Sequence, residues 1–339
     1  MRTALFSAIL GAAACTLAAP AGYSQTDNPK ATDAQSMFPN AVKLNVTAEG
    51  VSVDQAGNLY AVNATHFINL NSDKPLLIGV GSPKSHFASS RFTRKFGALV
   101  GDAVAHKVVV VAKDGGASTD FFTEPKMLQP NDMAINKKET FIYTSGMDYA
   151  ANKGELWVYD LAKKMTAKVD LAPKEFFRTN GIELSNDDKT LYLSSGENDA
   201  KGNVVGAKIF RFQIGDDGMP SKPELAIDLV TELTNHGLDA KGAMDPDGMR
   251  MATDGTLFIT LNGFGRVLAF DTNKKSSKII DLSTVGWPTN LELGGEDGKL
   301  LVVVGRCKNA MSSCVDKYMH GASGRAWTNL QPSNAKRCE

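Results

Sequence analysis

The chain is poor in cysteine, in histidine and in uncompensated charge, and each shortage argues against a class of function. Its 339 residues include 4 Cys and 5 His, and the histidines are scattered, with none at the spacing of a zinc site. Lys and Arg together number 37, as do Asp and Glu, so the net charge is zero. The sequence has no basic block and no basic amphipathic stretch, which argues against nucleic acid or a membrane surface as a partner.

Long apolar runs are also missing, apart from one short run at the N-terminus. Arg2 precedes an apolar stretch over Ala4–Ala19, which is followed by Pro20 and small residues. A membrane-spanning helix needs about 20 apolar residues, so this shorter run favours a cleaved signal peptide over residues 1–24. We expect the mature protein to begin between Pro20 and Thr26, in the periplasm or outside the cell, without membrane insertion.

Two alternatives to cleavage remain for this segment. The apolar run could be retained as an N-terminal anchor, or Cys15 could be acylated, although Ala12 stands where a lipobox has Leu or Val. After the signal peptide, we expect a flexible lead-in over 25–40 and a single domain over 41–335.

Three cysteines lie beyond the signal peptide: Cys307, Cys314 and Cys338. An oxidising compartment favours pairing, but an odd number leaves one thiol over. Cys307 and Cys314 bracket a short polar loop and are the favoured pair, with Cys338 free. A bond between Cys314 and Cys338, which would fix the C-terminus, and three free thiols are the alternatives.

One hairpin pattern, an apolar strand, a polar turn and a second apolar strand, recurs along the chain. Asp-Gly and similar turns between alternating apolar runs are strong hairpin signals. Five clear copies begin at residues 49, 131, 180, 247 and 290, and a weaker one covers Gly97–Val100 and Val108–Val111. Six copies in about 315 residues give about 52 per unit, close to the ~40–50 of a four-stranded propeller blade.

The repeat therefore predicts an all-β fold, a six-bladed β-propeller. Helical periodicity is confined to short stretches near Val230–His236. A β-sandwich is the alternative, but it gives no reason for one hairpin to recur six times.

Side chains with oxygen ligands open five of the repeats: Glu49, Asn131, Asn180, Asp247 and Asn290. The first strand of each propeller blade lines the central channel, so these residues should meet at one mouth. Any one of them alone is equally consistent with a turn, since Asn and Asp are common turn formers. Their recurrence at equivalent positions favours a shared site.

Carboxylate and amide oxygens are the ligands that Ca²⁺ prefers. We expect one divalent metal, Ca²⁺ first, although Mg²⁺, Mn²⁺ or Zn²⁺ could occupy the same ring. The run Asp245-Pro246-Asp247-Gly248 lacks the remaining ligands of an EF-hand, so that motif is rejected. Asp254 precedes Gly255 inside a hairpin and is expected to be a turn residue only.

Five segments in order resemble the signatures of the SMP-30/gluconolactonase family, and the likeness extends from about Glu49 to Trp327. They are Glu49-Gly50, Pro130-Asn131-Asp132, Thr179-Asn180-Gly181, Pro246-Asp247-Gly248-Met249, and Pro288-Thr289-Asn290-Leu291 with the glycine pairs after it. The resemblance implies a six-bladed propeller, a lactonase or related hydrolase activity, and direct metal binding by Glu49, Asn180 and Asp247. Asn131 would complete the metal shell or hold substrate.

We expect Asn131, Asn290, Gln129 and Asp148 to bind substrate, with Asp148 chosen as a candidate rim group although such a residue is more often a solvated loop residue. Gln129 stands where several sugar lactonases of the family have an Arg, so a sugar lactone is not assured. The segment from Cys307 to His320 is an unusual, cysteine-bearing version of the last blade. Tyr149 and His236 are further candidates for the rim, although such residues are more often solvated loop residues.

These residues suggest hydrolysis of a small lactone or ester, with the metal polarising the carbonyl and Asp247 as the base. The sequence lacks a Gly-x-Ser-x-Gly elbow, which argues against a serine nucleophile. A non-catalytic ligand-binding propeller is one alternative. An organophosphatase or other ester hydrolase is another, but Arg250 stands where that branch would need a carboxylate for its second calcium.

Overall fold

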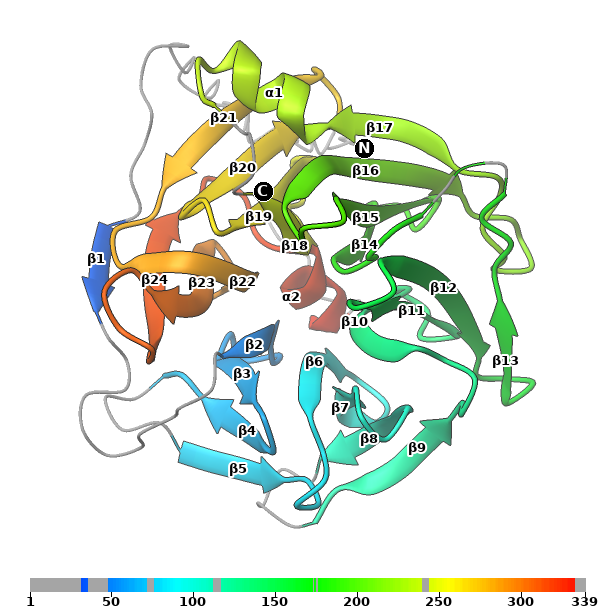
Figure 1. Ribbon diagram of the computed structural model, residues 1–339. Coiled ribbons are helices and arrows are strands. Elements are labelled where there is room, and N and C mark those ends of the chain that lie inside the picture. Colours follow the sequence, from blue (N-terminus) through cyan, green and yellow to red (C-terminus); the bar gives the residue numbers. More distant parts are fainter. Residues whose placement is uncertain are drawn as a thin grey trace, which may run out of the picture.

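The protein forms a ring of six antiparallel sheets around a central axis, as seen in the computed structural model (Figure 1). The structure describes residues 32–35, 48–71, 76–111, 117–172, 174, 176–239 and 244–332. Each sheet has four strands. The predicted six-bladed β-propeller is therefore confirmed.

The first three blades follow one another directly along the chain. Blade 1 comprises β2 Glu49–Val53, β3 Leu59–Asn63, β4 His66–Asn69 and β5 Leu76–Val80. Blade 2 comprises β6 Phe87–Thr93, β7 Gly97–Asp102, β8 Lys107–Val111 and β9 Thr119–Thr123. Blade 3 comprises β10 Gln129–Ile135, β11 Phe141–Asp148, β12 Lys153–Asp160 and β13 Met165–Lys168.

The other three blades complete the ring. Blade 4 comprises β14 Ile182–Leu184, β15 Thr190–Asn198, β16 Val204–Gln213 and β17 Glu224–Asp228. Blade 5 comprises β18 Asp245–Met251, β19 Thr256–Asn262, β20 Arg266–Asp271 and β21 Ser276–Asp281. Blade 6 comprises β22 Val285–Gly294, β23 Leu300–Cys307, β24 Ser313–Met319 and, as its outer strand, β1 Thr32–Gln35.

The pairing of β1 with β24 joins the beginning of the described chain to its last blade. Thr32–Gln35 falls in the segment that the sequence analysis treated as a lead-in before the domain, so part of that segment belongs to the propeller. The remainder of the lead-in and the expected signal peptide lie outside the described residues. Cys338 does too.

The weak copy of the repeat differs from the other five in its place within the blade. Five copies are the first and second strands of their blades, whereas Gly97–Val100 and Val108–Val111 belong to β7 and β8, the second and third strands of blade 2. The first strand of that blade, β6, carries Ser89, Ser90 and Arg91 in sequence. Ser90 contacts Ser52 of blade 1 and Arg91 contacts Asp132 of blade 3, and this run of buried polar side chains removes the apolar alternation by which a first strand is recognised.

Apolar side chains from adjacent sheets interdigitate to form the core between blades. The cluster between blades 4 and 5, for example, joins Ile209 and Ile227 to Met249, Leu257 and other buried residues of β18 to β21. Because this packing lies between the sheets, the inner strands keep polar side chains for the channel.

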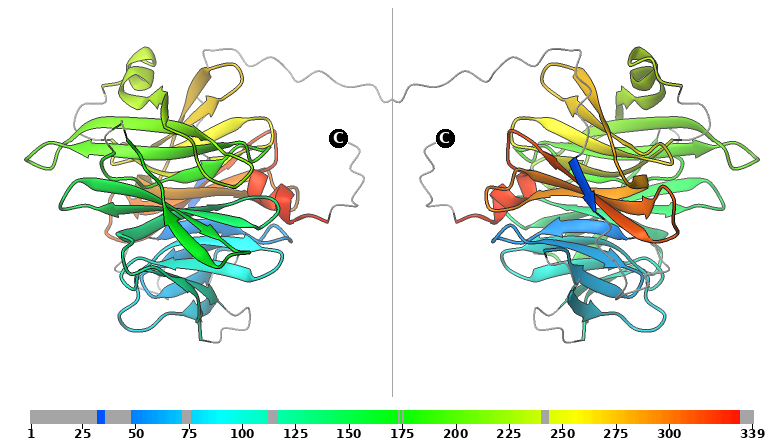
Figure 2. Two further views of the ribbon diagram at one scale, coloured as in Figure 1. Left: turned by 90° about the vertical axis from the view of Figure 1, so that its right-hand side faces the viewer. Right: turned by 90° about the vertical axis from the view of Figure 1, so that its left-hand side faces the viewer.

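Two short helices accompany the sheets in the described part of the chain. α1 Leu229–Asn235 lies at the outer edge beside β17 and β21, at the position where the sequence indicated helical periodicity. α2 Arg325–Leu330, which was not predicted, lies over the centre of the ring (Figures 1 and 2). Among the residues described, no helix is long and apolar enough to cross a membrane.

The disulfide favoured from the cysteine spacing is confirmed. Cys307 ends β23, Cys314 lies in β24, and their sulfur atoms are bonded. The bond closes the hairpin at the mouth end of blade 6.

Candidate functional site

Five inner strands bring the predicted ligands to one end of the central channel. The inner strands β2, β10, β14, β18 and β22 surround the axis (Figure 1). Glu49 begins β2, Asn180 comes shortly before β14, and Asn131 and Asp247 lie near the beginnings of β10 and β18. All inner strands run in the same direction along the axis, so their first residues meet at what we call the channel mouth.

Asp247 is the most constrained of these residues. Its side chain is buried, and Asn262 of the neighbouring strand β19 donates a hydrogen bond from Nδ2 to Asp247 Oδ2 at 3.0 Å. Burial raises the pKa of the Asp247 carboxyl well above its usual range, and the negative charge of Glu49 raises it further. The two carboxylates are therefore close enough to repel each other.

The carboxyl pKa of Glu49 is also raised. Burial raises the pKa of its carboxyl to about 8, against a hydrogen bond with Thr289 that lowers it, and the charge of Asp132 adds to the increase. Thr289 lies in β22 and also donates to the carbonyl oxygen of Ala48 at 2.6 Å. Blade 6 thus fixes the backbone next to Glu49.

Asn180 contributes an amide oxygen with no hydrogen-bond partner in the described part of the chain, although that oxygen is buried. The backbone around it is firmly held: its N–H donates to Ser194 Oγ at 3.3 Å, and its carbonyl accepts a hydrogen bond from Ser145. A Cβ at Gly181 would lie 2.1 Å from the carbonyl oxygen of Asp247, so only glycine permits this approach. The close approach of Gly181 to the backbone of Asp247 also brings the neighbouring Asn180 near Asp247.

Asn131 and Asn290 occupy different depths. Asn131 is half-buried at the mouth, whereas Asn290 is 3 % exposed and its Oδ1 accepts from the N–H of Leu291 at 2.9 Å. Asp132 makes the same local contact with the N–H of Met133 at 2.8 Å. Asn290 therefore corresponds to Asp132 in register, one residue further into the channel than the other four predicted residues.

The remaining predicted residues lie on the rim or away from it. Gln129 begins β10 opposite Met147 of β11, and Asp148 ends β11, where its Oδ1 accepts from the N–H of Ala151 at 2.9 Å. Tyr149 is 59 % exposed. His236, by contrast, follows α1 and contacts Ser277 of the outer strand β21 at 2.9 Å.

Arg178 and Asp245 form a rim ion pair that the sequence analysis did not identify. The guanidinium of Arg178 contacts both carboxylate oxygens of Asp245, with Nη2 to Oδ1 at 3.1 Å, and also reaches Asn198 Oδ1 at 2.7 Å. The ring of Tyr149 lies over the guanidinium, 4.8 Å from its carbon to the ring centre. The signal was available, because Arg178 and Asp245 each precede a predicted ligand by two residues, and alternate residues of a strand share a face.

Below the mouth, buried charges fill the channel. The Arg250 guanidinium contacts Glu292 at 3.0 Å, Asp132 at 3.1 Å and the carbonyl of Val51 at 3.0 Å. Arg91 contacts the other oxygen of Asp132 at 3.3 Å. Each charge is compensated, as buried charges must be.

Helix α2 closes the opposite end of this network. Its first residue, Arg325, is buried and reaches Glu183 of blade 4 at 3.2 Å and the carbonyl of Ile135 of blade 3 at 3.1 Å. The charged core of the channel and α2 together separate the mouth from the far face of the propeller.

The residues at the mouth fit a divalent cation. Glu49, which is half-buried, and the buried Asp247 are two carboxylates that repel each other, and the nearby amide oxygen of Asn180 has no donor within the described chain. Nowhere in the described residues do three or more His, Cys, Asp or Glu side chains gather as a metal-binding group. A site here would therefore be built from two carboxylates completed by amide oxygens, a donor set that suits Ca²⁺.

Comparison with known proteins identifies the family of the chain. The sequence pattern of the SMP-30/Gluconolactonase/LRE-like region matches residues 47–305, which include every inner strand. The chain belongs to this family. A search of curated proteins finds no match.

Solved structures of SMP-30/gluconolactonase type share the fold at low sequence identity. The calcium-binding protein regucalcin from Agrobacterium tumefaciens is 17% identical, with a TM-score of 0.60 over 82% of this chain and 93% of that one. A gluconolactonase from Xanthomonas campestris is 14% identical, with a TM-score of 0.62 over 85% and 91%. A luciferin-regenerating enzyme is 14% identical, with a TM-score of 0.64 over 82% and 93%.

Proposed function

We propose that this SMP-30/gluconolactonase-family propeller is a metal-dependent lactonase that opens a small lactone at the channel mouth. The observation that carries the proposal is the mutual repulsion of the Glu49 and Asp247 carboxylates near the buried amide oxygen of Asn180, which has no hydrogen-bond partner among the described residues. Two carboxylates that repel each other at a largely buried site are costly to ionise without a cation. Glu49, Asn180 and Asp247 would hold the metal, with Asn131 completing the shell or contacting substrate, and Ca²⁺ suits these oxygen donors first.

Lactone hydrolysis adds water across the acyl C–O bond and yields a hydroxy acid. When bound, the metal would polarise the carbonyl and stabilise the negative charge that develops on its oxygen. Asn262 fixes Oδ2 of Asp247, so we assign acceptance of the proton from the attacking water to its other oxygen, Oδ1.

Substrate would be held by amide groups rather than by a charged side chain. Asn131 and Gln129 lie at or near the mouth on β10, and Asn290 lies one residue deeper on β22. Asp148 uses one carboxylate oxygen to fix its own turn, which leaves the other for a substrate hydroxyl. The neutral Gln129 favours an uncharged lactone ring at this position.

A small panel of sugar, aliphatic and aromatic lactones, with one aryl ester and one phosphotriester, tests the proposal. Turnover of a lactone that requires added Ca²⁺ and stops with a chelator is the expected result. Turnover of the phosphotriester alone would assign an organophosphatase. Calcium-dependent binding of lactones without turnover of any compound would assign a ligand-binding propeller.

We also propose that the protein is exported, from Arg2, the short apolar run after it and the disulfide between Cys307 and Cys314. The intact mass of the protein recovered from the periplasm or medium should correspond to a chain that begins between Pro20 and Thr26. A mass that retains Met1, or an acylated Cys15, would contradict this.

A further inference from the structure

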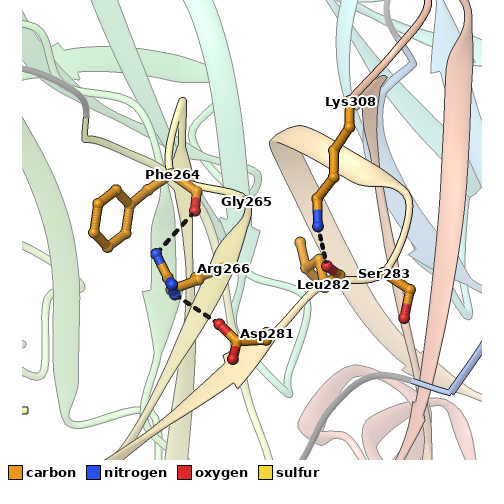
Figure 3. A pocket seen from close by; sticks show the side chains of 7 residues that line it. All are labelled: Phe264, Gly265, Arg266, Asp281, Leu282, Ser283 and Lys308. Carbon is orange, nitrogen blue, oxygen red and sulfur yellow. Dashed lines mark hydrogen bonds and ion pairs between the residues drawn. The ribbon is translucent and has the colours of Figure 1, made fainter. Parts of the chain in front are cut away.

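A second cavity opens on the same face of the propeller as the channel mouth, between blades 5 and 6 (Figure 3). Its volume is about 420 Å³, which is enough for a sugar-sized molecule. Residues 264–266 form one wall, 281–283 form the base, and Lys308 lies opposite. We call it the side pocket.

The side pocket is attached directly to the walls of the proposed metal site. Phe264 is two residues beyond Asn262, the residue that holds Asp247. On the other side, β22 leads from the pocket to Thr289, which holds the backbone next to Glu49. The pocket thus shares its supporting strands with the mouth but none of the proposed metal ligands.

Lys308 lies in the disulfide-closed hairpin of blade 6, which places it at this pocket. Lys308 follows Cys307, and its N–H donates to the carbonyl of Thr284 at 2.8 Å. Its side chain crosses Gly286, where a Cβ would lie 2.9 Å from the Lys308 Cα and 3.0 Å from its Cγ. Only glycine at position 286 leaves room for this path.

The backbone that follows the base of the pocket is also firmly held. Thr284 donates from its hydroxyl to Asp316 Oδ1 at 2.7 Å and from its N–H to Oδ2 at 3.0 Å, and Asp316 is fully buried in β24. The N–H of Val285 donates to the same carboxylate at 3.2 Å. The base of the pocket and the backbone of Lys308, which is bonded to Thr284, are therefore held in place by the fold before any ligand arrives.

The charges that line the pocket do not cancel. Arg266 Nε contacts Asp281 Oδ1 at 2.6 Å, so these two charges are paired. Lys308 Nζ donates to the carbonyl of Leu282 at 2.5 Å, and a carbonyl carries no compensating charge (Figure 3). One positive charge thus remains, and the ammonium has two further protons to donate.

Backbone carbonyl oxygens of Leu282 and Phe264 also line the pocket, whereas the Phe264 ring lies beyond Arg266 and away from Lys308 (Figure 3). The Phe264 ring centre lies 4.5 Å from the Arg266 guanidinium carbon. A cation with protons to donate and carbonyl oxygens nearby are the contacts that a small hydroxylated anion would use.

We propose that the side pocket binds the carboxylate of a small hydroxy acid, with Lys308 as the main anchor. The choice of a hydroxy acid rests in part on the proposed lactonase function, because ring opening of a lactone produces one. Binding itself needs no turnover, so the pocket and the activity can be tested separately.

Calorimetric titration of the mature, calcium-loaded protein with D-gluconate tests this assignment, with inorganic phosphate and the uncharged polyol sorbitol as comparison ligands. Lys308→Met should weaken gluconate binding at least about tenfold, as expected for loss of a charged hydrogen bond, whereas Lys308→Arg should retain it. Asp281→Asn removes the competing negative charge and should tighten binding several-fold. Sorbitol should not bind detectably.

Two controls make the result specific. Lys274→Met removes an equal charge from an exposed turn of blade 5 and should leave binding unchanged. Asp247→Asn, which should lose the calcium, is compared with the calcium-free wild type and should leave gluconate binding unchanged from it. Gluconate affinity that falls with Asp247→Asn but not with Lys308→Met would place the ligand on the metal and overturn the proposal.

The comparison ligands complete the test. Phosphate that binds as tightly as gluconate would overturn the assignment to a hydroxy acid. If gluconate binding depends on Lys308 while no lactone is turned over, the side pocket stands and the lactonase proposal fails. If lactones are turned over but gluconate binding does not depend on Lys308, the lactonase proposal stands and the side-pocket proposal fails.

Discussion

Asn262 donates a hydrogen bond from its side-chain amide to one carboxylate oxygen of Asp247, across the β18–β19 pair, at 3.0 Å. This bond engages one oxygen and sets the plane of the carboxylate. Residues that orient a metal ligand in this way commonly contribute tenfold to a hundredfold to metal affinity or activity.

We therefore expect Asn262→Ala to weaken calcium binding by about tenfold to a hundredfold and to lower turnover, while the protein stays folded. The matched control is Asn58→Ala, because Asn58 donates to Asp54 at 2.9 Å in a turn of blade 1 outside the site. Calcium titrations of both variants would check this. An equal change in the two variants would mean that Asn262 has no special relation to the site.

The pH dependence of calcium binding follows from the carboxyls of Glu49 and Asp247. In the metal-free protein, burial raises the pKa of Glu49 to about 8 and that of Asp247 well above its usual range. Calcium must displace these protons, so its affinity should fall as the pH is lowered through about 8. Calcium titrations from about pH 6 to pH 9 would measure the trend, and a flat profile would contradict it.

The stability of the metal-free protein should fall as the pH rises, whereas its calcium affinity should increase. The folded protein holds a proton on Glu49 up to about pH 8, whereas the unfolded chain releases it near 4.5. This stabilisation is complete below about pH 4.5 and is lost as the pH rises through about 8, so the free energy of unfolding should decline over that interval. Glu49→Gln should make the free energy of unfolding, measured by urea unfolding at a series of pH values, depend less on pH.

Arg250 holds the channel together rather than taking part in the reaction. Arg250→Met would leave Asp132 and Glu292 buried with fewer partners, which should cost about 3–5 kcal/mol in the free energy of unfolding. The control is Arg211→Met, which breaks an exposed pair with Glu224 and should cost about 0–1 kcal/mol. Urea unfolding of both variants would decide, and similar losses would mean that the buried network contributes little.

Features that repeat along the chain could be predicted from the sequence, because the same pattern recurs in successive blades. The hairpins, the six-blade ring and the positions of Glu49, Asn131, Asn180 and Asp247 at blade openings all follow from one pattern. Asn290 was assigned one register step too far toward the mouth, since Thr289 rather than Asn290 corresponds in register to Asp247. In a strand, a shift of one residue turns a side chain to the other face.

Features that depend on partners distant in the chain could not be predicted in the same way. Arg325 was not identified, because its partner Glu183 lies in blade 4 and the helix that carries it has no counterpart in the repeat. Asn262 lies at the end of a second strand, outside the openings that the pattern singled out. The side pocket forms where loops of two blades meet, so no single segment of sequence contains it.

Substitutions in the proposed metal shell should differ in how strongly they reduce lactone turnover. Glu49→Gln, Asn180→Ala and Asp247→Asn should each abolish lactone turnover with the propeller intact, because packing between blades rests on the apolar strands. Asn131→Ala should be milder and should lower turnover more than metal affinity. Circular dichroism would verify folding, and a loss of fold in all of the first three would mean that these residues are structural.

Calorimetric calcium titration of the wild type, Asp247→Asn and Asp254→Ala tests the central claim most directly. Asp247→Asn keeps the shape of the side chain but removes one negative charge at the mouth. Asp254 lies in the turn beyond the opposite end of β18, where it accepts from Thr256 and contacts His320 at 3.0 Å. We predict one calcium site in the wild type, its loss in Asp247→Asn and its retention in Asp254→Ala. Wild-type calcium affinity in Asp247→Asn, or loss of the site in Asp254→Ala alone, would contradict the placement of the metal at the channel mouth.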